Sequence, residues 1–301
     1  MPTARLTDRA VLAVMGETAA DFLQGLVTND VTKLNPGSGT YAALLTPQGK
    51  IVTDFLVHAA PGGFHLDAPA THAADLLKRL KLYRLRAPVT LEDLSPTHAV
   101  FAAWGANPLP HPEEGALAPV SKDVPPDPRL HALGARWIAP IDPPPFTGEV
   151  PPQGAEGADQ ALAAYHAHRL ALGVPDSADT EGQFALDANL EELHGLDFKK
   201  GCYVGQEVTA RMKHKAAPRR RLARLVFDGP APAPGTRLTG ADGTEVGELK
   251  SGHGREAMAS VRLNRITTTP QLSADGIPAT VVHSELLQPA LEAALSKATN
   301  E

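Results

Sequence analysis

Two proline-rich stretches interrupt this 301-residue chain and limit how it can fold. They read NPLPHPEEGALAPVSKDVPPD at 107–127 and DPPPFTGEVPPQGAEGAD at 142–159. Because proline removes a backbone donor and fixes its own backbone angle, such stretches favour long stiff loops or linkers over helices and strands. A chain of this length also exceeds one ordinary core. We therefore predict two or three packed domains, with a ligand site between domains as a natural expectation.

The first hundred residues have the pattern of a mixed α+β unit. Apolar runs such as YAALLT and IVTDFLVHA favour strands, whereas GETAADFLQGLV and THAADLLKRLKLY favour amphipathic helices. In the first of these helices Phe22, Leu23 and Leu26 recur at helical spacing. This spacing predicts that the three side chains pack into a core.

The second half of the chain changes from a helical to a strand pattern. QALAAYHAHRLALGV predicts a helix that ends at Gly173 and Pro175. Beyond Arg224, short alternating runs separated by glycine turns favour a small β-barrel or sandwich, followed by a helical, peripheral tail from Ser284. We divide the chain into an N-terminal region 1–105, a middle region 106–225, a barrel 226–290 and a tail 291–301.

The composition is that of a globular protein without a membrane partner. Hydrophobic residues make up 43% and charged residues 21% of the chain. No apolar stretch approaches the roughly 18 residues of a membrane span, and the first residues lack the pattern of a signal peptide. We therefore expect a cytoplasmic location. The net charge of -6 argues against broad, non-specific binding of nucleic acid.

Cys202 is the only cysteine of the chain. A disulfide within the chain is therefore excluded, and so is a closed cysteine-based metal site built from this chain alone, so we predict no metal site. Lys200 lies two residues away, and the neighbouring cations favour the thiolate form, which is the nucleophile and the metal ligand. The alternative is that the cysteine is a small buried apolar residue.

Cys202 also lies at the start of a strongly cationic segment. Residues 199–224 contain nine lysines and arginines against one acid, Glu207. Three interpretations remain open: a solvated face, a docking site for a polyanion such as tRNA or an acidic protein through Lys213 to Arg221, and a grip for the glutamate tail of a folate. Gly201 and Gly205 allow a tight turn or a close approach of the backbone to a ligand.

One segment resembles the signature of a known family. Residues 200–207 read KGCYVGQE, which matches the KGCYxGQE signature of the YgfZ family, and Arg211 continues the match. The segments FLQGLVTNDV, TPQGKIVTDF, LYRLRAPVTLED, RLALGVPD and VGELKSG are similar to family segments and follow in the same order. The resemblance extends from about residue 20 to residue 265.

The resemblance implies a fold, a cofactor and a cellular role. YgfZ proteins are folate-binding relatives of the glycine-cleavage T-protein, so we expect an α+β, three-domain ring with a C-terminal β-barrel and tetrahydrofolate, or a one-carbon derivative, in or near the central hole. The family is linked to the assembly and repair of iron-sulfur enzymes, including those that modify tRNA. Expected partners are therefore iron-sulfur proteins or their assembly factors.

The resemblance also assigns roles by position. Cys202 is expected to be the reactive or ligating thiol, with Lys200 and Arg211 as its electrostatic support. Tyr203, Gln206 and Glu207 are expected to form the surrounding folate site, to which Arg211 also contributes.

Two further places are compared with the related aminomethyltransferases, which use a carboxylate near a GG-I-x-D-D segment. The equivalent stretch here is GKIVTD, which keeps one acid, Asp54, as a candidate catalytic group. Asn29 and Asp30 are secondary candidates for folate contact, although an Asn-Asp pair after a helix often only turns the chain. FALDANLEEL, from Phe184, lacks the expected proline and glutamine, which puts the pocket wall there in question.

Three functions follow from these observations. The first is a folate-binding accessory protein in which Cys202 reacts with or transiently ligates an iron-sulfur species. The second is an enzyme, an aminomethyl or one-carbon transferase that acts through Asp54. The third is a docking module for tRNA or a protein. The sequence leaves open which folate is bound, whether a substrate is turned over, and the oligomeric state.

Overall fold

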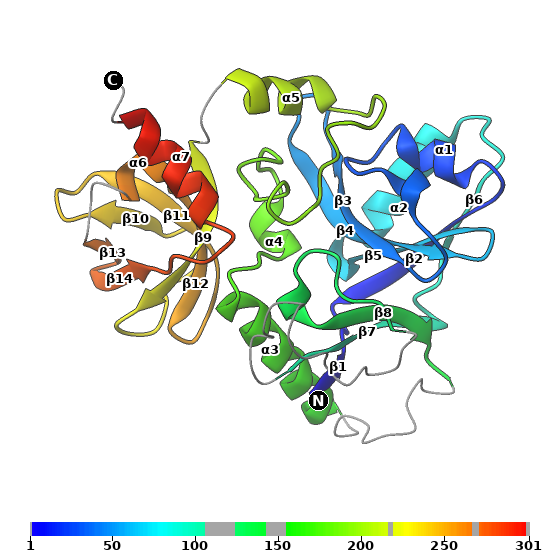
Figure 1. Ribbon diagram of the computed structural model, residues 1–301. Helices are drawn as coiled ribbons and strands as arrows, with labels where there is room; N and C mark the ends of the chain where they lie inside the picture. The colour runs from blue at the N-terminus through cyan, green and yellow to red at the C-terminus, as the bar shows by residue number, and fades with distance from the viewer. Residues whose placement is uncertain (1, 106–123, 143–154, 216–218, 267–270, 299–301) are drawn as a thin grey trace, which may run out of the picture. The chain divides into compact units, whose positions relative to one another are not determined.

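The computed structural model describes residues 2–105, 124–142, 155–215, 219–266 and 271–298, drawn as coloured ribbon in Figure 1. The chain forms two compact units. Unit 1 consists of Met1–Leu45, Thr53–His166 and Leu193–Val204, and unit 2 of Thr46–Val52, Ala167–Glu192 and Gly205–Glu301. Most of the two predicted proline-rich loops lies outside the described residues.

Unit 1 is built on a five-stranded sheet. Its strands, in spatial order, are β3 (Gly39–Leu45), β4 (Ile51–Ala60), β5 (Gly63–Pro69), β2 (Arg9–Met15) and β6 (Thr90–Asp93). The helical elements of this part are α1 (Ala19–Gln24), the 3-10 turn η1 (Val31–Lys33) and α2 (Ala70–Arg84). Leu23 and Leu26 of the first predicted helical stretch are buried against the sheet and Phe22 packs partly against it, so the predicted core stripe is confirmed.

A second, three-stranded sheet completes unit 1. It contains β1 (Thr3–Arg5), β7 (His98–Ala103) and β8 (Ala135–Pro140), with the 3-10 turn η2 (His131–Leu133) before β8. The predicted long helix is α3 (Ala155–Ala171), and its Tyr165 packs edge-on to Trp104 in the core beside this sheet.

Unit 2 contains the predicted barrel, which is confirmed as a closed one and is coloured yellow to red in Figure 1. Its strands are β9 (Arg220–Phe227), β10 (Arg237–Gly240), β11 (Glu245–His253), β12 (Glu256–Arg262), β13 (Leu272–Ala274) and β14 (Ile277–Val281). The helices of unit 2 are α4 (Ser177–Thr180), α5 (Gln206–Lys215), α6 (Leu263–Ile266) and α7 (Gln288–Ala298). The tail is helical as predicted, but the expectation that it is peripheral is wrong, because its Ala290 and Leu291 are buried in the core of the barrel unit.

The turn between β3 and β4 belongs to unit 2 and packs against α5. Gly49 has a φ of +80°, and a Cβ placed there would lie 2.9 Å from the Cβ of Val208. The next residue, Lys50, forms a β-bridge with Phe184. Glycine is therefore required at 49 by both the backbone angle and the approach of the helix.

The mixed α+β class and the C-terminal barrel agree with the predicted fold. In the described parts of the chain, no helix combines the length and the apolar character that a membrane span requires.

Candidate functional site

Cys202 lies on an exposed loop that precedes α5. Its side chain is exposed, and a Cβ added at the neighbouring Gly201 would meet no heavy atom within 4 Å. The loop ends at Gly205, whose φ of +83° is readily adopted only by glycine, and α5 then starts at Gln206. The thiol is therefore accessible to a partner, and the alternative of a buried apolar cysteine is wrong.

Lys200 anchors this loop from inside unit 1. Its side chain is buried, and its Nζ donates to the carbonyl oxygens of Val27 at 2.6 Å and Asn29 at 2.8 Å. The same ammonium lies 5.2 Å from the centre of the Tyr203 ring, which is also buried. Burial lowers the pKa of Lys200 to about 8, although Asp30 and Asp197 oppose the shift. The structure thus assigns Lys200 an anchoring contact that the sequence did not indicate.

Replacing Lys200 by Met is expected to lower the free energy of unfolding by about 2 kcal/mol, because two carbonyl groups lose their charged donor. Urea unfolding of the variant measures the change. Lys199→Met is the matched control, since the neighbouring lysine is exposed and its side chain should contribute little. Equal stability of the two variants would contradict the anchoring role.

The predicted folate contacts Asn29 and Asp30 are occupied by interactions within the protein. The Asn29 amide donates to Thr40 Oγ1 at 2.7 Å and to the carbonyl of His194 at 2.6 Å. Burial raises the pKa of Asp30, but hydrogen bonds from Thr32 and Lys33 outweigh it and lower the pKa to about 2. The contact with His194 joins the segment after α1 to the segment that leads to Cys202.

Lys33 also connects the segment after α1 to the segment that leads to Cys202. Its Nζ contacts Asp30 at 3.1 Å and Asp197 at 2.6 Å, and the hydrogen bonds that it donates to Asp197 and Asp30 raise the pKa of Lys33. Asp197 in turn accepts from the backbone N–H of Lys199 at 2.7 Å. The base of the cysteine loop is therefore held by several polar contacts in unit 1.

The candidate acid Asp54 is buried on β4, with an exposed fraction of 4%. Tyr41 donates its hydroxyl to Asp54 Oδ2 at 2.8 Å, and the Arg129 guanidinium lies 5.9 Å from the centre of the Tyr41 ring. The acid thus belongs to the interior of unit 1, where its partner Tyr41 lies beside a buried cation.

The remaining predicted site residues lie on α5 in unit 2. Glu207 and Arg211 form an exposed ion pair one helical turn apart, with a distance of 2.6 Å, and Gln206 is half-buried at the start of the helix. The structure therefore gathers Lys200, Tyr203 and Asn29 in unit 1, and Gln206, Glu207 and Arg211 in unit 2.

Several cations of the basic segment are paired with acids. Lys213 contacts Glu191, Arg221 contacts Glu192 at 2.9 Å, and Arg224 contacts Glu256 at 2.7 Å. Residues 216–218 lie outside the described part of the chain. A tRNA contact through Lys213 to Arg221 stays a prediction.

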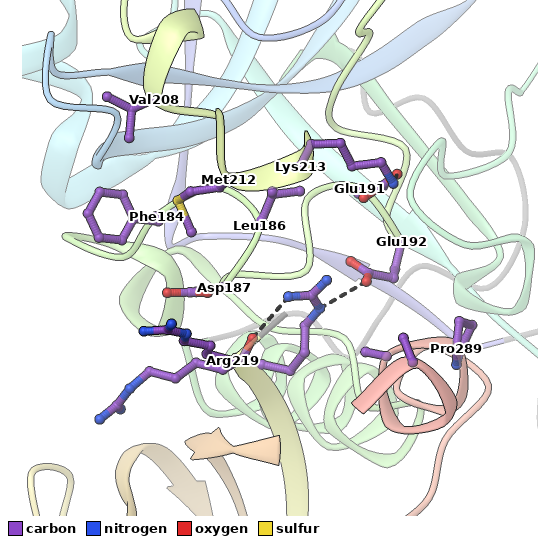
Figure 2. A pocket seen from close by; sticks show the side chains of 14 residues that line it. Phe184, Leu186, Asp187, Glu191, Glu192, Val208, Met212, Lys213, Arg219 and Pro289 are labelled. Carbon is purple, nitrogen blue, oxygen red and sulfur yellow. Dashed lines mark hydrogen bonds and ion pairs between the residues drawn. The ribbon is translucent and has the colours of Figure 1, made fainter. Parts of the chain in front are cut away.

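Unit 2 also contains a pocket of about 740 Å³, shown in Figure 2. Its apolar lining includes Phe184, Leu186, Val208 and Met212, and α7 contributes Pro289. These side chains come from three separate segments of unit 2, which only the folded chain brings together. The pocket offers an apolar slot that is large enough for a small organic molecule.

Charged groups of both signs line the same pocket. Asp187 is half-buried, and burial raises its pKa against the opposing effect of Arg221 and Arg220. Glu192 Oε1 accepts from Arg221 Nε at 2.9 Å, whereas Arg219 is exposed. Asp187 and Glu192 were not among the predicted site residues. Acids within the otherwise apolar stretch FALDANLEEL were the available signal.

Two family comparisons match separate parts of the chain. Residues 7–109 match the GCVT N-terminal domain, and residues 219–287 match the C-terminal beta-barrel domain of CAF17. The second range contains all six strands of the closed barrel.

Curated relatives are about one-third identical to this chain over the aligned residues. The mitochondrial iron-sulfur cluster assembly factor IBA57 of Mus musculus is 32% identical, over 87% of this chain and 78% of the relative. The protein of the same name from Homo sapiens is 32% identical, over 85% of this chain and 76% of the relative. The homolog from Neurospora crassa is also 32% identical, but this chain spans only 54% of its length.

A solved structure shows the same fold. The glycine cleavage system aminomethyltransferase T from Bartonella henselae has a TM-score of 0.69 and 19% identity, over 94% of this chain and 85% of that protein. At this identity the likeness establishes the fold alone.

The relatives correct one expectation and establish the family. The predicted cytoplasmic location is wrong by this comparison, because the relatives above are named as mitochondrial proteins. The expected link to iron-sulfur assembly is confirmed at the level of the family. With its GCVT N-terminal domain, its C-terminal barrel and its similarity to IBA57 over most of both chains, this chain belongs to the CAF17/IBA57 family.

Proposed function

We propose that this chain is an accessory protein for iron-sulfur cluster assembly, of the YgfZ type within its family, and that Cys202 is its working group. The relatives named as iron-sulfur cluster assembly factors and the KGCYVGQE segment support the proposal. The observation that carries it is the exposure of the only cysteine on a loop whose base is anchored by buried Lys200.

The chemistry expected of Cys202 is transient ligation of an iron atom of a cluster. A thiolate binds iron, but a single thiolate cannot hold a cluster that needs four protein ligands. The remaining ligands therefore come from a partner protein, and the cluster is cargo that passes between the two. An exposed thiol on an anchored loop suits such a bridging contact because it can meet a partner without reorganising its own unit.

Replacing Cys202 by Ala is expected to reduce support of an iron-sulfur enzyme to the level of a strain without this protein. Cys202→Ser should fail similarly, because a hydroxyl is a poor substitute for a thiolate toward iron. Enzyme activity in a deletion strain that carries each variant measures the effect, with Arg237→Ala on β10 as an exposed control. Wild-type support by the Ala variant would remove the thiol from the function.

The cofactor in this proposal is a folate, either tetrahydrofolate or a one-carbon derivative. Its aminopyrimidine edge needs hydrogen-bond acceptors, and its ring needs an apolar slot. Its glutamate tail needs cations. The unit 2 pocket has all three kinds of group: Asp187, the walls around Phe184 and Met212, and Arg219. The residues present thus fit a folate, which when bound supplies a carrier for a one-carbon unit.

The two other candidate functions gain less support. The transferase needs an acid that can reach a bound substrate, whereas Asp54 is buried and accepts a hydrogen bond from Tyr41. The docking of tRNA needs unpaired cations, whereas Lys213 and Arg221 already contact Glu191 and Glu192. No specific observation favours either function over the first.

A further inference from the structure

The end of α2 exposes a cluster of large apolar side chains. Five such side chains are exposed in the described part of the chain, and three of them lie within one four-residue stretch. Their exposed fractions are 68% for Leu82, 41% for Tyr83 and 86% for Leu85. Single exposed apolar residues are ordinary, whereas a cluster of them marks a site of interaction. Residues 78–86, which contain this cluster, are called the α2-end surface below.

The α2-end surface takes no part in the core of unit 1. The helix buries Ala73, Leu76 and Leu80, whose spacing places them on one face, against the sheet. Residues 81–86 follow directly, and all six are exposed. The final turn of α2 therefore adds no buried side chain to unit 1. Folding of the unit does not account for its apolar residues.

The backbone at Leu85 is strained. Its φ is +46°, at the position directly after α2. A bulky residue rarely adopts this angle, and helices commonly place a glycine there. Because the Leu85 side chain is so exposed, packing within unit 1 does not offset the strain. Strained positions of this kind are concentrated at functional sites, so the leucine points to a contact outside unit 1.

Cations surround the apolar cluster. Lys78, Lys81, Arg84 and Arg86 are all exposed, and none of the four contacts an acid among the residues that the structure describes. The stretch 76–91 contains no acid at all. In a chain with a net charge of -6, this local excess of positive charge attracts an anionic partner, and salt weakens the attraction.

The arrangement of the two kinds of side chain favours a protein as the partner. A helix that lies in a membrane surface separates its apolar face from its cationic face, whereas the two kinds interleave through KLYRLR. Nucleic acid is bound through cations and stacked aromatic rings, so it leaves two exposed leucines without a contact. A protein surface with an apolar strip bordered by carboxylates complements both kinds of group.

We propose that the α2-end surface is a docking site for an acidic amphipathic helix of a partner protein. Leu82 and Leu85 contact the apolar strip of that helix, and the cations of the surface contact the carboxylates that border the strip. The site uses neither the thiol nor a folate. It is therefore independent of the proposed function.

The test is titration of the full chain with three synthetic helical peptides, followed by calorimetry. The first peptide has a leucine strip bordered by glutamates and should bind with a Kd of roughly 10–100 μM, as a small transient contact does. The second has the same composition without the strip, and the third has lysines in place of the glutamates. Both should bind at least about tenfold more weakly, because each lacks one complementary feature.

Leu85→Gly is the most informative variant. It should weaken binding of the first peptide about tenfold, because it removes a central apolar contact. Its melting temperature should be equal to or above that of the wild type, since glycine adopts a positive φ without strain. A loss of binding without a loss of stability separates docking from folding.

The cations are tested by the double variant Arg84→Gln and Arg86→Gln. It should weaken binding about tenfold and reduce the dependence of the Kd on salt. Leu295→Ser is the matched apolar control, because Leu295 is 50% exposed on α7 in unit 2. Arg237→Gln is the matched charge control, because Arg237 is exposed on β10. Both controls should bind like the wild type.

The outcomes decide the proposal. Binding of the first peptide that Leu85→Gly and the double arginine variant both weaken supports it. Binding that neither variant changes places the contact elsewhere and overturns it, and so does a failure of the first peptide to bind. Sedimentation with phosphatidylcholine–cardiolipin vesicles, or titration with tRNA, covers the other partners. Binding to either one that Leu85→Gly abolishes, without binding of the peptide, would replace the protein partner by a membrane or a nucleic acid and overturn the proposal.

Discussion

Replacing Asp67 by Asn is expected to lower the free energy of unfolding by about 3–5 kcal/mol, the usual cost of breaking a buried ion pair by removing one partner. Asp67 lies on β5 with no exposed surface. Its Oδ1 accepts from Arg9 Nε at 2.6 Å and its Oδ2 from Arg136 Nε at 2.6 Å. Burial raises the pKa of Asp67, but Arg136 and Arg9 outweigh it and hold the pKa well below its usual range. The variant leaves two buried guanidinium groups without their anion.

The loss of unfolding free energy should exceed that of the contacts of Asp67 alone, because Arg136 continues into a larger hydrogen-bond network. Arg136 Nη1 donates to the Tyr165 hydroxyl at 2.8 Å, and Arg129 Nη2 donates to the same oxygen at 3.0 Å. Arg129 also forms a fork with Asp127, at 2.7 and 3.0 Å. Such shared partners make the contributions of the individual pairs non-additive.

Urea unfolding of Asp67→Asn measures the expected loss. Asp75→Asn is the control, because Asp75 pairs with Arg79 at 2.5 Å on the exposed side of α2. Exposed pairs of this kind contribute only up to about 1 kcal/mol. If Asp67→Asn costs no more than the control, the buried pair does not stabilise unit 1.

The stability of the protein is expected to fall by about 3 kcal/mol between pH 6.5 and pH 4 through His58 alone, since one pKa unit corresponds to about 1.36 kcal/mol. Burial is the main cause that lowers the His58 pKa from 6.5 to about 4, with Asp67 opposing the shift and Arg136 adding to it. Between these two values the unfolded chain binds a proton that the folded chain does not. Stability therefore rises with pH across this window and is lost as the pH falls through it.

The measurement is the free energy of unfolding at several pH values from 4 to 7.5, for the wild type and His58→Gln. The variant should show a shallower slope, even though the substitution itself shifts the whole curve. His253→Gln should keep the wild-type slope, because this ring at the end of β11 is exposed. Part of the slope should persist in His58→Gln, since burial and the nearby His98 also lower the pKa of His65. Identical slopes for the wild type and His58→Gln would contradict the assignment.

Patterns of local periodicity predicted the secondary structure well. The core stripe of the first helical stretch, the long helix that carries Tyr165 and the strands beyond Arg224 all follow from the alternation of apolar residues along the chain. Closure of the barrel depends on pairings between distant strands, such as β10 with β13, which periodicity does not specify.

The candidate site was only partly predictable. KGCYVGQE led to Cys202, and the structure places that cysteine on an accessible loop. Lys200 was expected to support the thiol through its charge, yet its ammonium contacts carbonyl oxygens of residues more than 170 positions earlier in the chain. Asp187 was not predicted because its pocket also needs α5 and α7, which are separate segments of the chain.

The sequence by itself indicated the wider family of this protein, several of its helices and strands, and the single cysteine on which the proposed chemistry depends. Only the tertiary structure decided which charged groups are buried, which pair with one another and which line a pocket. The physical reason is that hydrophobic periodicity is a local property of the chain, whereas desolvation and hydrogen bonding of a charged side chain depend on segments that meet only after folding.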